Sequence, residues 1–210
     1  MKIKVPFIEM KDPLDCGPIA LQMTLSYFND KTYLDKLREL VGAEEGKGVW
    51  TIDLAVAARK LGYDIKYFSK IIGTAPENLE MDYYKRYASG DSEEMEMKNK
   101  NAKEIGVDVE IKSFRLEELL TFLDKEHMMI VLLDWNIVRN LEEKGYQGHF
   151  VPVVGYDKEK VYVHNPGMKD PMPSYPISRE VFDKARKAKG TDEDFILISK
   201  QNKISSPKNL

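Results

Sequence analysis

The order of the apolar patterns along the chain constrains its fold more than any other sequence feature. Apolar residues recur at helical spacing in 17–28, 32–41 and 51–61, where Thr51 is the expected cap of the third helix. Apolar and polar residues alternate in 63–68 and 107–114, as they do in half-buried strands. The first half of the chain is therefore predicted to be mainly helical.

The second half carries mostly strand patterns. Four segments predict strands: a continuous apolar run at 128–135, a hairpin formed by 149–156 and 161–166, and a last strand at 195–199. Two helices are also expected, one capped by Ser113 and ending near Glu126, before the first of these strands, and one over 178–189, before the last. Helices first and strands later predict an α+β fold, with a helical N-terminal half and a mostly antiparallel sheet in the C-terminal half.

The length of 210 residues favours one domain, which we assign to residues 1–199. The polar residues 200–210 are expected to form a disordered tail, and 89–95 an exposed loop. Pro152 cannot donate a ladder hydrogen bond, so its strand should lie at a sheet edge or contain a bulge.

Composition excludes several classes of protein. A net charge of −3 argues against a nucleic-acid partner, and a hydrophobic fraction of 42% argues against disorder. No apolar run of 18 residues or signal peptide is visible, so we expect a cytoplasmic protein without a membrane partner. One cysteine and three scattered histidines predict no metal site, and no cofactor motif is present. A peptide or protein substrate fits this composition best.

Cys16 lies where the first predicted helix begins, in the sequence DCGP. Unpaired N–H groups and the helix dipole stabilise a thiolate at this position, so the pKa of Cys16 should be lowered. A lone intracellular cysteine is more often a small buried hydrophobic residue, and that alternative stays open. The position at a helix start favours a nucleophile.

A thiol nucleophile needs a base and a group that orients the base. His149 and Asn165 can fill these roles because a shift of about one pair in the hairpin register brings them opposite each other. Cys16 and His149 lie about 130 positions apart, as in papain-type enzymes. His127 and His164 are weaker candidates, since His127 ends a helix and His164 faces away from Asn165.

Three segments then show a resemblance to known families. LDCGPIALQM (14–23), GHFVPVVGYD (148–157) and VHNPG (163–167) resemble the active-site segments of the papain-like double-glycine leader peptidases that process bacteriocins. Together with FDKARKAKGTDEDFILIS (182–199), they are still more similar to the guanylyl cyclase domain-containing proteins of plants and animals. The resemblance implies a papain-like fold with Cys16, His149 and Asn165 as a catalytic triad.

One departure from the related families concerns the oxyanion hole. Those families carry a glutamine six or seven positions before the cysteine, where this chain has Glu9 and Met10. Neither side chain can donate a hydrogen bond at neutral pH as glutamine does, and losing one such donor costs about 100 to 1000-fold in rate. A catalytically silent binding module is therefore the main alternative to a thiol hydrolase. A cyclase is less consistent with the sequence, which shows no phosphate loop or paired metal carboxylates.

Overall fold

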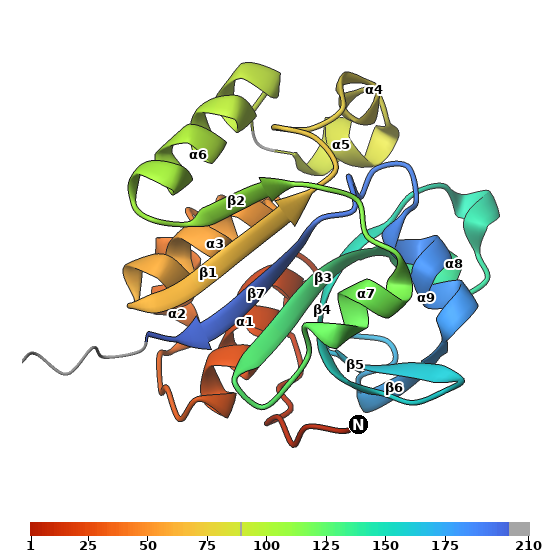
Figure 1. Cartoon of the computed structure of the whole chain (residues 1–210). Coiled ribbons are helices and arrows are strands. Elements are labelled where there is room, and N and C mark those ends of the chain that lie inside the picture. The colour runs from red at the N-terminus through yellow and green to blue at the C-terminus, as the bar shows by residue number, and fades with distance from the viewer. Residues whose placement is uncertain (89, 202–210) are drawn as a thin grey trace, which may run out of the picture.

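The computed structural model describes residues 1–88 and 90–201 of the chain. Seven strands form one sheet in the order β2-β1-β7-β3-β4-β5-β6 (Figure 1). Of the neighbouring strands, β1 and β2 run parallel and the other pairs antiparallel. The strands are β1 (Tyr63–Ser69), β2 (Asp108–Ile111), β3 (His127–Asp134), β4 (Gly148–Tyr156), β5 (Lys160–Asn165), β6 (Met172–Ser178) and β7 (Phe195–Lys200). This sheet confirms the predicted α+β class.

Helices cover both faces of the sheet. Helices α1, α2 and α3 bury apolar residues against one face, while α7 and α9 pack on the other (Figure 1). The helices are α1 (Cys16–Tyr27), α2 (Leu34–Leu40), α3 (Thr51–Lys60), α4 (Pro76–Leu79), α5 (Asp82–Tyr87), α6 (Ser92–Glu104), α7 (Leu116–Thr121), α8 (Trp135–Val138) and α9 (Arg179–Arg186), with a 3-10 turn η1 (Glu142–Lys144). Among residues 1–88 and 90–201, no helix is long and apolar enough to cross a membrane.

The three predicted N-terminal helices are confirmed within a few residues. Gly62 follows α3 with φ of +89°, a left-handed conformation that glycine adopts without strain and that ends the helix. The predicted cap Thr51 is wrong by one residue, because Trp50 occupies the cap position. The Asp53 carboxylate accepts a hydrogen bond from the Trp50 backbone N–H at 3.0 Å, which fixes the start of the helix.

The predicted hairpin is formed by β4 and β5. Pro152 lies opposite Ile130 of β3, so β4 is a central strand and the edge alternative is wrong. The pairing of β4 with β5 shifts between Val153 and Gly155, immediately after the proline. The bulge alternative is therefore confirmed, and it sets how the two strands meet at the site.

The predicted exposed loop at 89–95 holds at residues 90 and 91 but is wrong from Ser92 onward, where α6 begins. Asp91 caps α6, since its carboxylate accepts a hydrogen bond from the Glu94 N–H at 3.0 Å. Met95, Asn99 and Ala102 are buried at helical spacing and attach α6 to the core. Residue 89 lies outside the described residues.

The helix expected from Ser113 to Glu126 is shorter than predicted. Ser113 is not its cap, because its hydroxyl donates to the Glu193 carboxylate at 2.6 Å and α7 begins at Leu116. The strand predicted at 128–135 lies one residue earlier, since β3 covers His127–Asp134 and Trp135 starts α8.

The observed bounds of other predicted elements also differ from the prediction. The strand expected at 107–114 is confined to β2, and the helix expected at 178–189 ends at Arg186. Ser178 caps that helix by accepting a hydrogen bond from the Val181 N–H at 3.2 Å. Lys200 belongs to β7 opposite Tyr63, so the predicted tail begins too early. Residues 202–210 of that predicted tail lie outside the described residues.

Candidate active site

Cys16 is the first residue of α1, as the sequence predicts, and the residue before it is held firmly. Asp15 is 5% exposed, and its carboxylate forms a two-point ion pair with Arg38 of α2, whose Nε lies 2.9 Å from Asp15 Oδ1. A forked pair of this kind fixes direction as well as distance. Arg38 thus anchors the start of α1 to α2 and compensates a buried negative charge beside the thiol.

The expected lowering of the Cys16 pKa is wrong. Cys16 keeps a partly exposed surface, but protein atoms crowd its sulfur, and this burial raises its pKa to about 11. The Asp15 charge raises the pKa further, while backbone N–H groups of Phe150 and Gly17 act in the opposite direction. Desolvation therefore outweighs the helix start, and the thiol is protonated at neutral pH.

His149 and Asn165 are brought together as predicted. The Nε2 atom of His149 lies 3.0 Å from Asn165 Oδ1, and both residues are buried. Asn165 is held by two further bonds: Oδ1 accepts from the Gly167 N–H at 3.0 Å, and Nδ2 donates to the Asp170 carbonyl at 2.6 Å. These bonds fix the amide so that its oxygen faces the imidazole. His149 Nε2 consequently donates the proton, which leaves Nδ1 as the basic nitrogen.

The His149 ring is neutral in this environment. Burial lowers its pKa to about 4, and the bond to Asn165 offsets only part of this effect. Trp135 packs against the imidazole with ring centroids 4.7 Å apart, which keeps water from the His149–Asn165 bond. Within residues 1–88 and 90–201, no hydrogen bond joins the Cys16 thiol to the His149 ring. The backbone places them in the same region, because the N–H group that hydrogen-bonds to the Cys16 thiol is that of Phe150, the residue after His149.

The two competing histidines have other partners. His127 starts β3 and its Nδ1 lies 3.0 Å from the Asp124 carboxylate. His164 is buried, with Nε2 3.0 Å from the Val5 carbonyl and Nδ1 accepting from the Ser174 N–H at 3.0 Å. These contacts give each ring a structural role away from Asn165.

Glu9 and Met10 lie beside the site without supplying a donor from their side chains. The Met10 N–H donates to the Pro166 carbonyl at 3.0 Å, so this segment runs along the loop that follows Asn165. The Met10 side chain packs against the core that α1 also joins, whereas Glu9 is exposed. The backbone places position 10 next to the site, but its thioether has no proton to donate.

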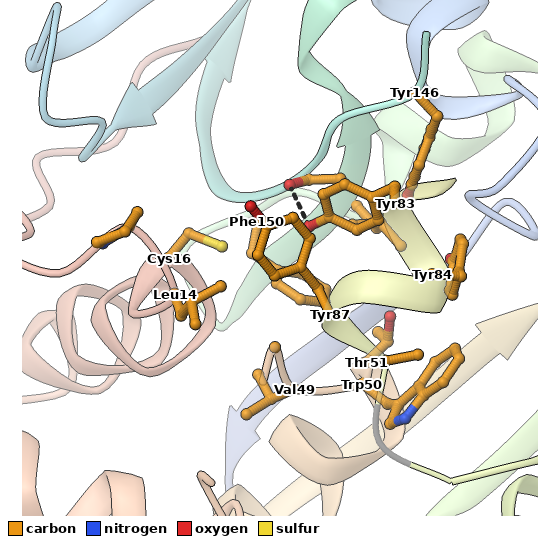
Figure 2. Close-up of a pocket in the computed structure, with 15 residues that line it drawn as sticks. Leu14, Cys16, Val49, Trp50, Thr51, Tyr83, Tyr84, Tyr87, Tyr146 and Phe150 are labelled. Carbon is orange, nitrogen blue, oxygen red and sulfur yellow. Dashed lines mark hydrogen bonds between the residues drawn. The ribbon is translucent and has the colours of Figure 1, made fainter. Parts of the chain in front are cut away.

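A small pocket borders the thiol, and its aromatic residues were not predicted. The cavity measures about 50 Å³, and Figure 2 shows tyrosines gathered around it opposite Cys16. Tyr83 and Tyr87 come from α5, and the Tyr83 hydroxyl donates to the Gly148 carbonyl at 3.1 Å, directly before His149. The signal in the sequence was the pair of tyrosines at positions i and i+4, which lie on one face of a helix.

Comparison with known proteins places this chain in a family. The family described as guanylylate cyclase matches residues 5–198. The chain belongs to this family. A curated relative, guanylyl cyclase 1 of Arabidopsis thaliana, is 26% identical over 215 residues, covering 94% of this chain and 76% of the relative.

Solved structures establish the fold. A C39-like peptidase from Bacillus anthracis aligns with a TM-score of 0.60 at 18% identity, covering 96% of this chain and 98% of that one. A double-glycine motif protease of an AMS/PCAT transporter, solved with its leader peptide, aligns with a TM-score of 0.53 at 18% identity, covering 95% and 94%. The peptidase domain of Streptococcus ComA gives 0.52 at 16% identity, covering 94% and 98%. The predicted papain-like fold and the predicted family are confirmed.

Proposed function

We propose that this chain is a papain-like thiol hydrolase that cleaves a peptide or amide bond with Cys16, His149 and Asn165. The His149–Asn165 hydrogen bond of 3.0 Å is the observation that carries the proposal. It selects the tautomer with a free Nδ1, which a base near a helix-start thiol requires. The complex of a similarly folded protease with its leader peptide supports a peptide as substrate. A cytoplasmic location belongs to the same proposal, since a free thiol stays reduced there.

The reaction would begin from a neutral pair. As the Cys16 sulfur attacks the carbonyl carbon, Nδ1 of His149 takes the thiol proton, and the carbonyl oxygen gains the negative charge. The imidazolium then gives this proton to the leaving amine, the C–N bond breaks and a thioester remains. Water, deprotonated by His149, hydrolyses the thioester, releases the acid and restores the thiol. Asn165 keeps the ring oriented throughout through its bond to Nε2.

Stabilisation of the oxyanion rests on the backbone in this proposal. The N–H of Cys16 at the start of α1 is one donor, and the helix dipole favours negative charge at this end. Met10 and Glu9 add no side-chain donor. The hydrolase should therefore be slow compared with enzymes that have the glutamine.

A binding module without turnover is the second candidate. It is favoured by the raised pKa of Cys16 and the lowered pKa of His149, which together disfavour a thiolate and imidazolium pair. A cyclase has less support. Within the described residues, no three acidic, histidine or cysteine side chains converge as metal ligands, although magnesium-dependent cyclisation relies on such carboxylates.

One experiment distinguishes the proposed hydrolase from a binding module without turnover. Wild type, Cys16→Ala and His149→Ala would be compared on a panel of fluorogenic peptide amides, with His127→Ala as the matched control. We expect turnover in wild type and the control, and loss of turnover in the other two. Because the chain has one cysteine, iodoacetamide labelling at pH 8.5 followed by mass spectrometry reports its accessibility directly. The raised pKa of Cys16 alone should slow native labelling by about 100-fold relative to a free cysteine, and a thiol that is slower than this until the protein is denatured would refute the hydrolase.

A further inference from the structure

The pocket beside Cys16 is enclosed by uncharged residues from distant parts of the chain. Gly48 and Val49 come from the loop before α3, Tyr87 and Ala88 from the end of α5, and Phe150 from β4. Figure 2 shows the thiol at the wall of this pocket, facing the tyrosine side chains. None of its described lining residues is charged, so a charged group entering it would lose water without gaining an opposite charge.

The size of the pocket limits what it can hold. Its volume is about 50 Å³, whereas an apolar cavity of about 150 Å³ holds one benzene molecule. In proportion, the pocket has room for about two or three carbon atoms. An alanine, valine or threonine side chain fits this space, while phenylalanine does not. Glycine would leave it empty.

The position of His149 indicates which side of the cleaved bond the pocket serves. His149 does not line the pocket among the described residues, although its neighbours Gly148 and Phe150 do. Its ring lies against Trp135 and Asn165 instead. Since the imidazolium must reach the leaving amine, the leaving group belongs on the His149 side. The pocket is then left for the residue that supplies the carbonyl.

We infer that this pocket selects substrates with a small, uncharged, branched aliphatic residue on the acyl side of the scissile bond. The inference rests on the proposed thiol hydrolase and defines its substrate class. Each buried carbon of a fitting side chain should raise the rate about fourfold, so the three side-chain carbons of valine should raise it about 60-fold over glycine. Tyr87 and Ala88 set the upper size limit because their side chains close one side of the cavity.

Peptidyl chloromethyl ketones that differ only in the acyl-side residue test this selectivity. The Cys16 sulfur displaces chloride, the thiol proton leaves through the base to solvent, and a stable thioether records the event in the mass of the protein. We expect the valine probe to inactivate wild type about 60-fold faster than the glycine probe, and at least about tenfold faster than the phenylalanine or aspartate probe. Rates would be measured at equal concentrations and pH.

Two variants move the size limit in opposite directions. Tyr87→Ala enlarges the pocket and keeps the backbone carbonyl that accepts a bond from the Gly48 N–H at 2.8 Å, so the phenylalanine probe should gain about tenfold. Ala88→Leu fills the pocket, so glycine should become the best probe. Tyr33→Ala is the matched control, because Tyr33 is 80% exposed and should leave the order unchanged.

The outcomes separate the two proposals. Equal rates for all four probes in wild type, with labelling still confined to native Cys16, would overturn the pocket assignment and leave the hydrolase standing. An unchanged order in both pocket variants would also overturn it. Failure of every probe to modify native Cys16 would overturn the hydrolase and this inference together.

Discussion

Replacing Asn165 with aspartate tests the electrostatics of the site most directly. Asn165→Asp keeps an oxygen acceptor 3.0 Å from His149 Nε2 but adds a negative charge to it. It also removes the Nδ2 donor to the Asp170 carbonyl, a bond of 2.6 Å in wild type.

The expected shift follows from the distance. Two unit charges 3.0 Å apart attract by about 5 kcal/mol at an effective dielectric of about 20, equivalent to about 4 pKa units. Burial of the new carboxylate and loss of the Asp170 contact consume part of this energy. We expect the pKa of His149 to rise by at least about 2 units, from about 4 in wild type to about 6 or above.

Proton NMR of the three histidines measures this shift, with His149→Ala used for assignment. Asn99→Asp is the matched control, because Asn99 is also buried and donates to a carbonyl, that of Met95, but has no histidine partner. The reasoning is refuted if His149 titrates near 6.5 in wild type. It is equally refuted if Asn165→Asp leaves the His149 pKa near 4 while the protein remains folded.

Three further predictions follow from the same environments. Burial raises the pKa of Asp194 from 3.8 to about 7, so the stability that its protonated form contributes is complete below pH 3.8 and lost as the pH rises to about 7. In Asp194→Asn, the free energy of unfolding should therefore fall by roughly 2–4 kcal/mol less between pH 4 and 8 than in wild type, as measured by urea unfolding. Met10→Gln should raise peptide hydrolysis by up to about 100-fold and Cys16→Ala should abolish that gain, whereas no gain in a folded variant would place the oxyanion elsewhere. With GTP and magnesium, wild type should form no more cyclic GMP than a Cys16→Ala, His149→Ala double variant. Cyclic GMP formation that exceeds this control and disappears when a pair of carboxylates is removed would contradict the prediction.

The sequence located the candidate triad because each residue carries a local signal. Cys16 opens an apolar helix, and His149 and Asn165 flank a hairpin whose turn is polar. The sequence did not predict the register in which β4, β5 and β6 pair. The bulge after Pro152 and the pairing of Asn165 with Met172 on β6 decide which side chains meet, and neither follows from alternation alone.

The missed elements β6 and α5 have different physical causes. Strand β6 contains Pro173 and Pro176, which argue against a strand, yet it is an edge strand where missing donors cost little. Helix α5 has six residues, too few for a clear period. Its position depends on distant contacts, such as the Tyr83 bond to Gly148. Local patterns could not predict the pocket that α5 closes.

The ionisation of Cys16 shows how tertiary burial overrides a local rule. A helix start stabilises an anion by about 0.3–1 kcal/mol and at most about 2 kcal/mol. The rise of the Cys16 pKa from 9.0 to about 11 corresponds to about 3 kcal/mol in the opposite direction. The energy of desolvation is larger than this difference and larger than the contribution of the helix start, because the Cys16 pKa is raised even though the N–H groups of Gly17 and Phe150 lower it.

This imbalance defines how the site could work. His149 has a pKa of about 4, so its imidazole is unprotonated throughout the neutral range but only weakly basic, while Cys16 retains its own proton until about pH 11. Proton transfer must then accompany attack on the substrate and cannot precede it. A side chain that fills the pocket also brings its carbonyl to the thiol and compensates part of that cost through binding. In the proposed hydrolase, substrate fit and nucleophile activation would therefore be one event, and the residues around the pocket would be as important to turnover as Cys16, His149 and Asn165.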